Sequence, residues 1–597
     1  MEAGTTATPT TGSTTIADLL GKAAEQYADR VALRHKVDGA WQDVTYAEVG
    51  ETVSEIGRGL IDLGIAPGER VSLLCNTRPE WTYADFAISS TGAVVVPVYP
   101  TNSPGECEWV AGNSESVAVV CEDAEQVAKI TEIRERLPDL RHVIVVDSEG
   151  ETGDAVSLDD LRERGRARDA DELAQRAAAI TPDDAFTFIY TSGTTGPPKG
   201  CVLSHGNYRS VLDMCESLDM MDGDQVTYLF LPLAHAFALL IQLLSIDAGA
   251  TLAYYGGDTK QIVPELSEVK PTYLPSVPRI FEKIYTLAIG SQPPETREKM
   301  TAAARLGVKV RDMQLRGEAV PAELQEPFDA AEEQLFKNVR AIFGGNVKQA
   351  VTGAAPIAKD ILEFFYGCGV PVLEGYGMTE TATVATYSTP EEHRFGTVGR
   401  ALPGCEIRIA DDGEILIKGA NIFGGYYKND DASFGTVVDG WLHTGDLGSL
   451  DEDGFLSITG RKKDIIITAG GKNLTPANLE NDLKQTRWVS QAVMHGDRRP
   501  FPVMLVTLDE EEILPWAKEQ GLPQDIATLA REPAVRELIQ TELDNANRHY
   551  AQVEQVKKFV ILDHDLTQET GELTPTLKVK RNVVNEKYAR LFDELYG

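Results

Sequence analysis

Apolar residues alternate along the chain between short continuous runs and helical spacing. Between residues 46 and 147, amphipathic helical patterns separate apolar runs that are as short as buried strands. Strands that alternate with helices need crossover connections, which make neighbouring strands parallel, so this region predicts a wound α/β sheet. The runs are Val71–Cys75, Val94–Val98, Val117–Cys121 and His142–Val146.

The first part of the chain predicts a helix and a hairpin. Thr15 is a suitable N-cap for an amphipathic helix over Ile16–Ala28. The runs Val31–His35 and Trp41–Thr45 flank Asp38-Gly39, a residue pair that favours tight hairpin turns. We therefore expect a two-stranded ribbon directly after the first helix.

The alternation of strands and helices resumes after a glycine-rich stretch at 191–200. Residues 148–183, which precede it, are charged and weakly patterned, and they predict a surface connection. Residues 289–340 carry a long polar helical pattern that is interrupted by prolines. The later runs that predict strands are Val226–Leu231, Thr251–Tyr255, Thr272–Leu274, Val347–Thr352 and Val370–Leu373.

A chain of 597 residues exceeds what one hydrophobic core normally supports, so we expect at least two domains. Residues 396–460 change to short runs with Asp-Gly turns, which predict a small β-rich unit. The predicted organisation is a flexible polar leader over 1–15, a large domain of wound α/β sheets plus the β-rich unit over 16–462, and a small α+β domain over 463–597.

Composition and charge argue against several functional classes. A net charge of −36 disfavours nucleic-acid binding through a basic surface and a polybasic contact with anionic lipid. The most apolar stretches, Thr91–Val98 and Ala236–Ile246, are shorter than the ~20 residues of a membrane-spanning helix. Residues 1–15 lack the basic and apolar regions of a signal peptide. Seven cysteines without C-x-x-C spacing fit the reducing cytoplasm, where we expect the protein.

The stretch Ala185–Ser204 carries the strongest chemical signal. An apolar run, Ala185–Tyr190, leads into a loop of Thr, Ser, Gly and Pro, and a second apolar run begins at Cys201. Glycine amides, hydroxyl groups and the ammonium of Lys199 are suited to binding a polyphosphate. The loop differs from a P-loop, because two prolines precede the lysine and a strand is expected to follow it. A structural turn is the alternative for such a composition.

The ten residues Thr191–Gly200 resemble the signature loop of the adenylate-forming superfamily, which contains acyl-CoA synthetases, peptide-synthetase adenylation domains and luciferases. Further stretches resemble other motifs of this superfamily, in the order that its members show. The resemblance extends over nearly the whole chain and implies binding of ATP and Mg²⁺. The stretches are Leu231–His235, Gly353–Pro356, Glu374–Glu380, Gly440–Asp446, Gly460–Asp464 and Thr574–Lys578.

The resemblance implies a nucleotide site that is assembled from these motifs. Tyr376 offers a flat face to the purine, and stacking of a base on an aromatic ring contributes ~1–3 kcal/mol. Asp446 can accept hydrogen bonds from both ribose hydroxyls, and Arg461 adds a donor. Outside such motifs, an ordinary half-buried tyrosine and a turn aspartate are the alternatives. The implied nucleotide-binding residues are Thr191, Ser192, Gly193, Thr194, Thr195, Gly196, Lys199, Gly353, Ala354, Glu374, Gly375, Tyr376, Gly377, Met378, Thr379, Asp446 and Arg461.

Glu380 and Thr191 are the implied magnesium ligands. A carboxylate is a hard oxygen ligand of the kind that Mg²⁺ prefers, and the ion bridges phosphate oxygens. A solvated surface carboxylate is the alternative for an isolated glutamate, but Glu380 follows a Gly-Tyr-Gly turn.

Lys578 is the implied catalytic residue of the first reaction step. Attack of a carboxylate on a triphosphate brings anions together, so catalysis must come largely from positioning and positive charge. The neighbours Lys580 and Arg581 allow an alternative, in which all three cations lie exposed at the start of a helix. The commoner form of the motif has glycine where this chain has Leu577, and in this respect the chain resembles the long-chain fatty acid members.

His235 is implied to guard the acyl channel near the reacting carboxylate, without a role in proton transfer. A histidine packed in the core is the alternative. Lys463 is implied as the hinge about which a mobile C-terminal domain rotates between two half-reactions, and without the resemblance it is a surface lysine. In the second state, the loop that contains Gly470 and Lys472 is implied to reach the pantetheine tunnel of coenzyme A.

Several features are similar to the long-chain fatty acid–CoA ligase branch in particular. They are Val277–Lys283, the helical segment 289–340, Thr397–Gly399 and the Thr-Pro-Thr-Leu-Lys ending at Lys578. This branch implies that a fatty carboxylate attacks MgATP to give acyl-adenylate and pyrophosphate, after which CoA displaces AMP to give the thioester. The intermediate supplies the leaving group that a bare carboxylate lacks. We expect no carrier-protein domain after Gly597.

Other functions stay open at this point. A fatty acyl-AMP ligase would pass the adenylate to a carrier protein, although the insertion of those relatives is not evident around residue 460. An inactive acyl- or nucleotide-binding homologue is disfavoured by the presence of Lys578, Glu380 and Asp446 together. Luciferase-type oxygenation would need a rigid aromatic pocket. At most a peripheral membrane contact is expected, and only because long acyl chains are insoluble.

Overall fold

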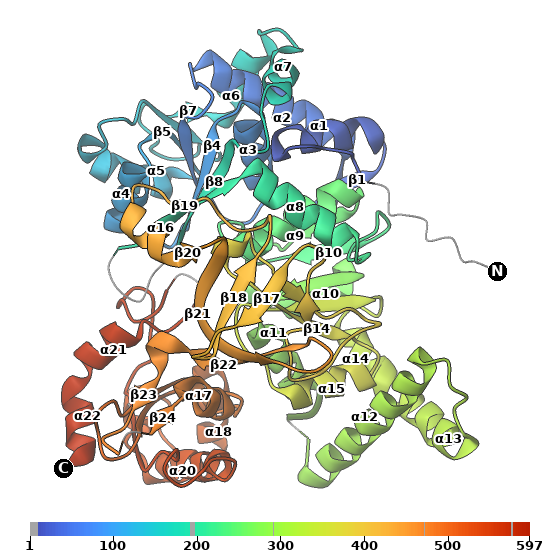
Figure 1. Cartoon of the computed structure of the whole chain (residues 1–597), viewed down its shortest axis with the longest axis vertical. Helices are drawn as coiled ribbons and strands as arrows, with labels where there is room; N and C mark the ends of the chain where they lie inside the picture. Colours follow the sequence, from blue (N-terminus) through green and yellow to red (C-terminus); the bar gives the residue numbers. More distant parts are fainter. Residues whose placement is uncertain (1–9, 192–196, 291, 471, 575–576) are drawn as a thin grey trace.

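The computed structural model describes residues 10–191, 197–290, 292–470, 472–574 and 577–597. Two large sheets with their helices and a five-stranded sheet form the chain before residue 463, and a smaller body of sheet and helices follows (Figure 1). Within these ranges, no helix is long and apolar enough to cross a membrane.

The first large sheet contains nine strands, most of them parallel. The predicted hairpin forms one edge of this sheet, and Asp38 and Gly39 are both left-handed at its turn, as a tight hairpin requires. The later apolar runs supply the parallel strands, as predicted from their alternation with helices. In spatial order the strands are β16 (Arg400–Ala401), β15 (Thr386–Tyr387), β14 (Val372–Tyr376), β13 (Gln349–Thr352), β12 (Tyr273–Ser276), β10 (Val226–Leu229), β11 (Thr251–Tyr254), β1 (Val31–Val37) and β2 (Ala40–Thr45).

The second large sheet contains eight strands. The four strands predicted between residues 46 and 147 lie side by side in it and are parallel. The glycine-rich loop connects β8 to β9, which are antiparallel, so the expected strand after the loop is confirmed. In spatial order the strands are β19 (Gly425–Tyr426), β9 (Lys199–Ser204), β8 (Ala185–Thr191), β4 (Val94–Val98), β3 (Arg70–Leu74), β5 (Ser116–Cys121), β6 (His142–Val145) and β7 (Val156–Ser157).

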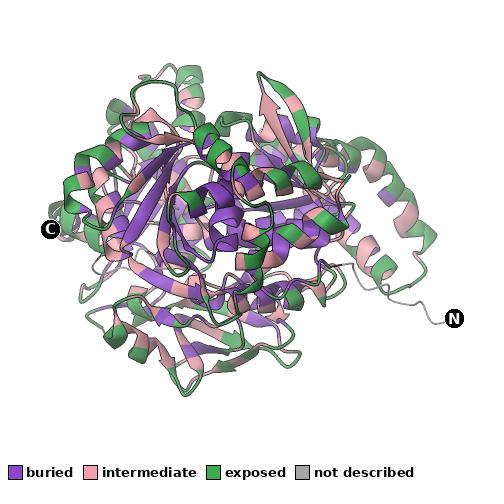
Figure 2. Ribbon diagram, turned by 90° about the horizontal axis from the view of Figure 1, so that it is seen from above, coloured by how far each residue is buried: buried purple, intermediate pink, exposed green. Residues whose placement is uncertain are grey.

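Helices cover both faces of each large sheet. One buried apolar cluster joins the facing sides of the two sheets through the helices between them, which are α1 (Ile16–Gln26), α2 (Tyr46–Asp62), α3 (Pro79–Ser90), α8 (His205–Glu216) and α9 (Ala236–Ala248). The apolar stretch from Ala236 therefore forms a buried core helix, α9, in the interior that Figure 2 shows. The outer faces pack on α4 (Pro104–Asn113) and α5 (Ala124–Ile133) in one sheet, and on α10 (Ile262–Val269), α11 (Pro278–Tyr285), α14 (Lys337–Ile342) and α15 (Lys359–Gly367) in the other.

The structure corrects the prediction for residues 148–183. This segment forms α6 (Leu158–Arg166) and α7 (Glu172–Ala178), and α6 packs on α2. The approach is close, because a Cβ atom on Gly165 would lie 1.8 Å from the carbonyl oxygen of Glu55. The Glu55 carboxylate also accepts hydrogen bonds from two arginines of α6. The buried apolar positions of α6 are Leu158 and Leu161, and two such positions in a charged stretch are too few for the hydrophobic pattern to reveal the helix.

The predicted polar helical stretch over 289–340 is confirmed. Its main helices are α12 (Pro294–Leu315) and α13 (Ala322–Ala331), which project from the rest of the molecule (Figure 1).

The prediction of a small β-rich unit over 396–460 is confirmed only in part. Five of its strands form a separate antiparallel sheet. The other two, β16 and β19, extend the large sheets, where each pairs with an edge strand. The separate sheet contains β17 (Glu406–Ile409), β18 (Glu414–Lys418), β20 (Val437–Val438), β21 (Trp441–Leu450) and β22 (Leu456–Arg461).

The chain after residue 463 is an α+β body. Its main sheet contains β25 (Val489–His495), β26 (Val503–Leu508) and β27 (Lys558–Ile561). One face of this sheet packs on α17 (Pro476–Lys484), α18 (Glu510–Glu519) and α20 (Pro533–Asn547). The other face packs on α21 (Arg581–Lys587) and α22 (Ala589–Tyr596). A small ribbon of β23 (Ile466–Ile467) and β24 (Asn473–Leu474) precedes it.

Candidate active site

The glycine-rich loop is anchored on both sides by the β8–β9 hairpin. The predicted phosphate contacts Ser192, Gly193, Thr194, Thr195 and Gly196 lie outside the described residues. The ammonium of Lys199, at the start of β9, lies 5.0 Å from the ring centre of Tyr426. On α4, the indole N–H of Trp109 donates a hydrogen bond of 2.8 Å to the carbonyl of Pro198. The loop is therefore tied to a helix that the motif analysis did not include.

Glu380 and Thr191, the predicted metal ligands, lie in one place. Glu380 is 7% exposed, and its carboxylate accepts a hydrogen bond of 2.7 Å from the hydroxyl of Tyr426. The Thr191 hydroxyl lies 3.9 Å from the sulfur of Cys201, and the charge of Glu380 acts with burial to raise the pKa of that thiol. Sequence reasoning missed Tyr426, because no motif surrounds it.

This donor set fits magnesium that is bound mainly through phosphates. Among the described residues, no group of three or more His, Cys, Asp or Glu side chains could hold a metal by itself. Mg²⁺ keeps several waters and usually takes one or two carboxylates plus substrate phosphate oxygens. The Tyr426 hydroxyl donates to Oε1 of Glu380, and a carboxylate with about four lone-pair positions retains acceptor capacity for an ion.

The predicted ribose residues, Asp446 and Arg461, form a connected set with Tyr376, the predicted purine-stacking residue, at the carboxyl end of β14. The Tyr376 hydroxyl donates a hydrogen bond of 2.7 Å to Asp446 Oδ2, and Arg461 Nε donates one of 2.6 Å to Oδ1. Asp446 is 4% exposed. A carboxylate has about four lone-pair positions. Two of them are occupied here, so Asp446 retains acceptor capacity for a pair of hydroxyl groups.

At the residues predicted to bind adenine, backbone segments pack closely against one another. A Cβ atom on Gly377 would lie 2.1 Å from the carbonyl oxygen of Thr383, so only glycine fits there. Ala354, which follows β13 and Gly353, has a left-handed backbone (φ 67°). Thr379 begins a short 3-10 helix that carries Glu380. These positions bring the ends of β13 and β14 to one edge of the sheet, where ligands bind in open α/β folds.

Glu374 lies beside this backbone, and the pKa of its carboxyl group is raised. Burial raises the pKa of its carboxyl group to about 8. In the sheet it is paired with Thr352, whose hydroxyl is buried and has no hydrogen-bond partner among the described atoms. At neutral pH the Glu374 carboxyl is therefore mainly protonated and can both donate and accept hydrogen bonds.

Lys578 lies on a tight turn of the C-terminal body. Its N–H donates to the Thr574 hydroxyl at 3.0 Å, and its carbonyl accepts from the Thr574 N–H at 2.8 Å. Leu577 has a left-handed backbone (φ 59°), which explains why glycine is favoured at this position. Two hydrogen bonds to Thr574 therefore hold the backbone of Lys578.

The structure brings Lys578 to the predicted nucleotide residues. Burial and then the charge of Arg461 lower the pKa of the Lys578 ammonium, while Asp446 and Glu380 oppose this shift. The ammonium in turn helps burial to lower the pKa of His235 to about 4. Residues from five separate motifs therefore act on one another in one region.

His235 is the N-cap residue of α9. Its Nδ1 accepts a hydrogen bond of 3.2 Å from the N–H of Phe237, so the proton of the neutral imidazole is on Nε2. With a pKa of about 4, this ring is uncharged at neutral pH and offers an N–H donor. That state suits a polar contact with a carboxylate and does not suit a general base.

Three predicted residues lie away from this cluster. Lys463 is exposed in a one-turn 3-10 helix, Lys462–Asp464, directly after β22. Gly470 and Lys472 lie between β23 and β24, and the Lys472 ammonium is 3.6 Å from Glu554. The structure therefore shows the arrangement in which Lys578, and not the loop with Lys472, faces the nucleotide residues.

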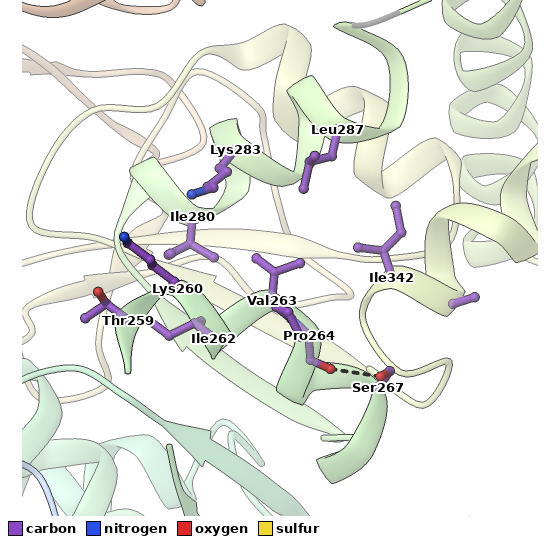
Figure 3. Close-up of a pocket in the computed structure, with 11 residues that line it drawn as sticks. Thr259, Lys260, Ile262, Val263, Pro264, Ser267, Ile280, Lys283, Leu287 and Ile342 are labelled. Carbon is purple, nitrogen blue, oxygen red and sulfur yellow. Dashed lines mark hydrogen bonds between the residues drawn. The ribbon is translucent and has the colours of Figure 1, made fainter. Parts of the chain in front are cut away.

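A cavity of about 400 Å³ lies elsewhere, between α10, α11 and α14 (Figure 3). Its lining includes the apolar side chains of Ile262, Val263 and Ile280, with Lys260 and Lys283 on one side. The lining contains none of the predicted site residues, so this cavity is separate from the cluster around Asp446.

Comparison with known proteins gives consistent matches over both bodies. The family described as AMP-binding enzyme matches residues 20–427, and the AMP-binding enzyme C-terminal domain matches residues 463–597. The chain is 39% identical to long-chain-fatty-acid–CoA ligase FadD15 of Mycobacterium bovis over 576 residues, which cover 95% of each protein. It is 32% identical to long-chain-fatty-acid–CoA ligase ACSBG2 of Xenopus laevis over 98% of this chain and 84% of that protein.

Among solved structures, the chain is similar to o-succinylbenzoate coenzyme A synthetase (MenE) of Bacillus subtilis in complex with ATP and magnesium ion. The TM-score is 0.67 at 22% identity, and the similarity covers 95% of this chain and 98% of that one. At this identity the match supports the fold alone.

Proposed function

The chain belongs to the AMP-binding enzyme family, and from that premise we propose that it is an AMP-forming long-chain fatty acid–CoA ligase. It activates a fatty carboxylate with ATP and transfers the acyl group to coenzyme A. The observation that carries the proposal is the meeting of Lys578, from the C-terminal body, with Asp446, Glu380 and His235 of the large body. Relatives that match nearly end to end are named for this activity.

In the first step, a carboxylate oxygen attacks the α-phosphorus of ATP, and the bond from that phosphorus to pyrophosphate breaks. Asp446 and Arg461 hold the ribose, Tyr376 stacks on the adenine, and Glu374 with the Gly353-Ala354 turn faces the adenine. Magnesium, when bound, supplies positive charge to the phosphate oxygens, and Glu380 and Thr191 would hold it. These contacts place the nucleotide before the reaction begins.

Lys578 and His235 act on the reacting groups themselves. The Lys578 ammonium offsets the charge that builds up between the carboxylate and the α-phosphate. The neutral His235 donates its Nε2 proton in a hydrogen bond to the carboxylate and orients it. Neither residue needs to transfer a proton, because the carboxylate attacks as the anion.

In the second step, the CoA thiolate attacks the acyl carbonyl and AMP leaves with the electron pair of the broken carbon–oxygen bond. We propose that the C-terminal body rotates at Lys463 between the steps. This rotation withdraws Lys578 and brings Gly470 and Lys472 toward the pantetheine group of CoA. A hinge of a few residues is sufficient for such a rotation.

The proposed setting is the cytoplasm, with at most peripheral membrane contact. All seven cysteines are free thiols, and burial raises the pKa of Cys75, Cys121 and Cys215, which keeps them unreactive. Free, unreactive thiols fit a reducing compartment.

The test measures pyrophosphate and AMP with acids of two to about twenty carbons, with and without CoA. We expect CoA-dependent AMP release that is greatest with long chains. Lys578→Ala should lower pyrophosphate formation ~10²–10³-fold, as loss of a well-placed electrostatic donor does. Lys580→Ala, two residues away, is the matched control and should keep the wild-type rate.

Two results would overturn the proposal. Pyrophosphate formation while AMP stays bound despite added CoA would identify a ligase that serves a carrier protein. Absence of turnover with every acid would identify a binding homologue.

A further inference from the structure

The two bodies meet at an ion-pair contact between α11 and the start of α18. The Lys283 ammonium lies 2.8 Å from Glu511 Oε2, and the Arg279 guanidinium pairs with the Asp509 carboxylate. Figure 3 shows Lys283 on α11, at the side of the cavity where Lys260 lies. None of these residues belongs to the nucleotide site.

Charge on the two faces of this contact is complementary. Asp509 is the N-cap residue of α18, but its side chain makes no capping hydrogen bond and is directed to Arg279 instead. Lys283 first, and then Lys260, lower the pKa of Glu511, so its carboxylate is kept ionised. Two adjacent ion pairs with the cations on α11 and the carboxylates at the start of α18 define one register between the bodies.

The C-terminal face of this contact is connected rigidly to Lys578. Ile513 of α18 and Leu483 of α17 are buried in one apolar cluster. Glu480, also on α17, accepts a hydrogen bond of 2.8 Å from Arg581 Nη1. Arg581 begins α21, directly after the turn that carries Lys578. The position of α18 on α11 therefore determines where the Lys578 turn lies.

We propose that Arg279 and Lys283, with Asp509 and Glu511, are positioning residues for the adenylation step. We call these two ion pairs the interdomain latch. The latch holds the C-terminal body in the orientation that brings Lys578 to the nucleotide residues, and it must open before the CoA step. This inference rests on the proposed function, because it assigns the latch to one half-reaction.

The test separates the two half-reactions. We measure pyrophosphate release in a single turnover with palmitate and ATP, and thioester formation from supplied palmitoyl-adenylate and CoA. Lys283→Glu combined with Arg279→Ala should slow the first reaction about fivefold to tenfold, since two partly exposed ion pairs are lost and one becomes repulsive. The second reaction should stay within about twofold of wild type or become faster.

Exchanging the two charges of one ion pair shows whether the pair positions the C-terminal body or whether the substitution only damages the fold. Lys283→Glu alone should slow pyrophosphate release, and adding Glu511→Lys in the same chain should restore it. Lys337→Glu is the matched control, because Lys337, at the start of α14, pairs with Glu333 of the preceding helical turn and is similarly exposed. Equal slowing of both half-reactions, or failure of the exchange to restore the first, would overturn the proposal.

A distance measurement that needs no turnover tests the interdomain latch independently of the proposed function. Dyes on Glu326→Cys in α13 and Lys518→Cys in α18 report the distance between the bodies, since the native thiols are buried or half-buried. Energy transfer between the two dyes should change in Lys283→Glu. It should return to the wild-type value in the variant that carries both Lys283→Glu and Glu511→Lys. An unchanged signal would refute the latch. If energy transfer changes and returns in this way in a protein that shows no ligase turnover, only the proposed function is refuted.

Discussion

At the scale of single residues, the position of Lys578, the proposed catalytic lysine, depends on the backbone next to it. Leu577 is 65% exposed and left-handed, so its side chain makes little contribution to packing. A left-handed backbone costs a non-glycine residue about 1 kcal/mol. The Thr574 hydrogen bonds to Lys578 offset this cost and hold the turn.

The first prediction concerns this turn. Leu577→Gly removes the conformational cost but adds about 0.5–1 kcal/mol of unfolded-state entropy, so stability and pyrophosphate release should stay close to wild type. Leu577→Val places a β-branched side chain at a left-handed position and should slow pyrophosphate release about tenfold. Single-turnover assays and thermal unfolding measure both effects. Equal rates for the two variants would show that the backbone at residue 577 does not matter.

At the scale of helices and strands, the fold depends on close contacts that the hydrophobic pattern of the sequence does not reveal. The α2–α6 contact combines buried Leu158 and Leu161 with a close approach at Gly165 and hydrogen bonds to the Glu55 carboxylate. The strands that flank the glycine-rich loop, in contrast, follow from their two apolar runs, and the strand expected after the loop is present. Elements with a clear apolar pattern were therefore predictable, whereas a short helix with few apolar positions in a charged stretch was not.

The second prediction tests the α2–α6 contact. Gly165→Ala should lower the free energy of unfolding by about 1–3 kcal/mol, because its Cβ atom would overlap the Glu55 backbone and separate the helices. Gly21→Ala in α1 is the control, since nothing lies within 4 Å of its Cβ position. That substitution should be neutral or stabilise the protein by about 0.5–1 kcal/mol. Urea unfolding measures both, and equal stability of the two variants would refute the close contact.

At the scale of the whole molecule, buried histidines make stability depend on pH. Burial lowers the pKa of His205 to about 4, and burial with the Lys578 charge does the same for His235. In the unfolded chain the ordinary value is about 6.5. Between these values the unfolded state binds more protons, so stability rises with pH in this window and is lost on acidification.

The third prediction follows from this sign. The free energy of unfolding should fall as the pH decreases from about 6.5 to 4, and His235→Asn should make this fall less steep. Asparagine is a suitable replacement because it can also cap α9. The exposed His549 is the control, and His549→Asn should leave the slope unchanged. Urea titrations over this pH range measure the slopes, and a wild-type slope in His235→Asn would contradict the assigned pKa.

The sequence by itself determined most of the strands and helices with a clear apolar pattern, the residues of each motif and the family to which the chain belongs. These are local properties, because a strand, a turn or a phosphate-binding loop is encoded by neighbouring residues. For the same reason, the sequence indicated Lys578, Asp446 and Glu380 as site residues without showing that they meet.

Only the tertiary structure decided which distant residues act on one another. It placed the Tyr426 hydroxyl on Glu380, tied Trp109 to the glycine-rich loop, and set α18 against α11. It also decided that Lys578, rather than Lys472, faces the nucleotide residues. Such contacts depend on how two separately encoded bodies pack, and pairing between residues far apart in the chain leaves no periodic signal in the sequence.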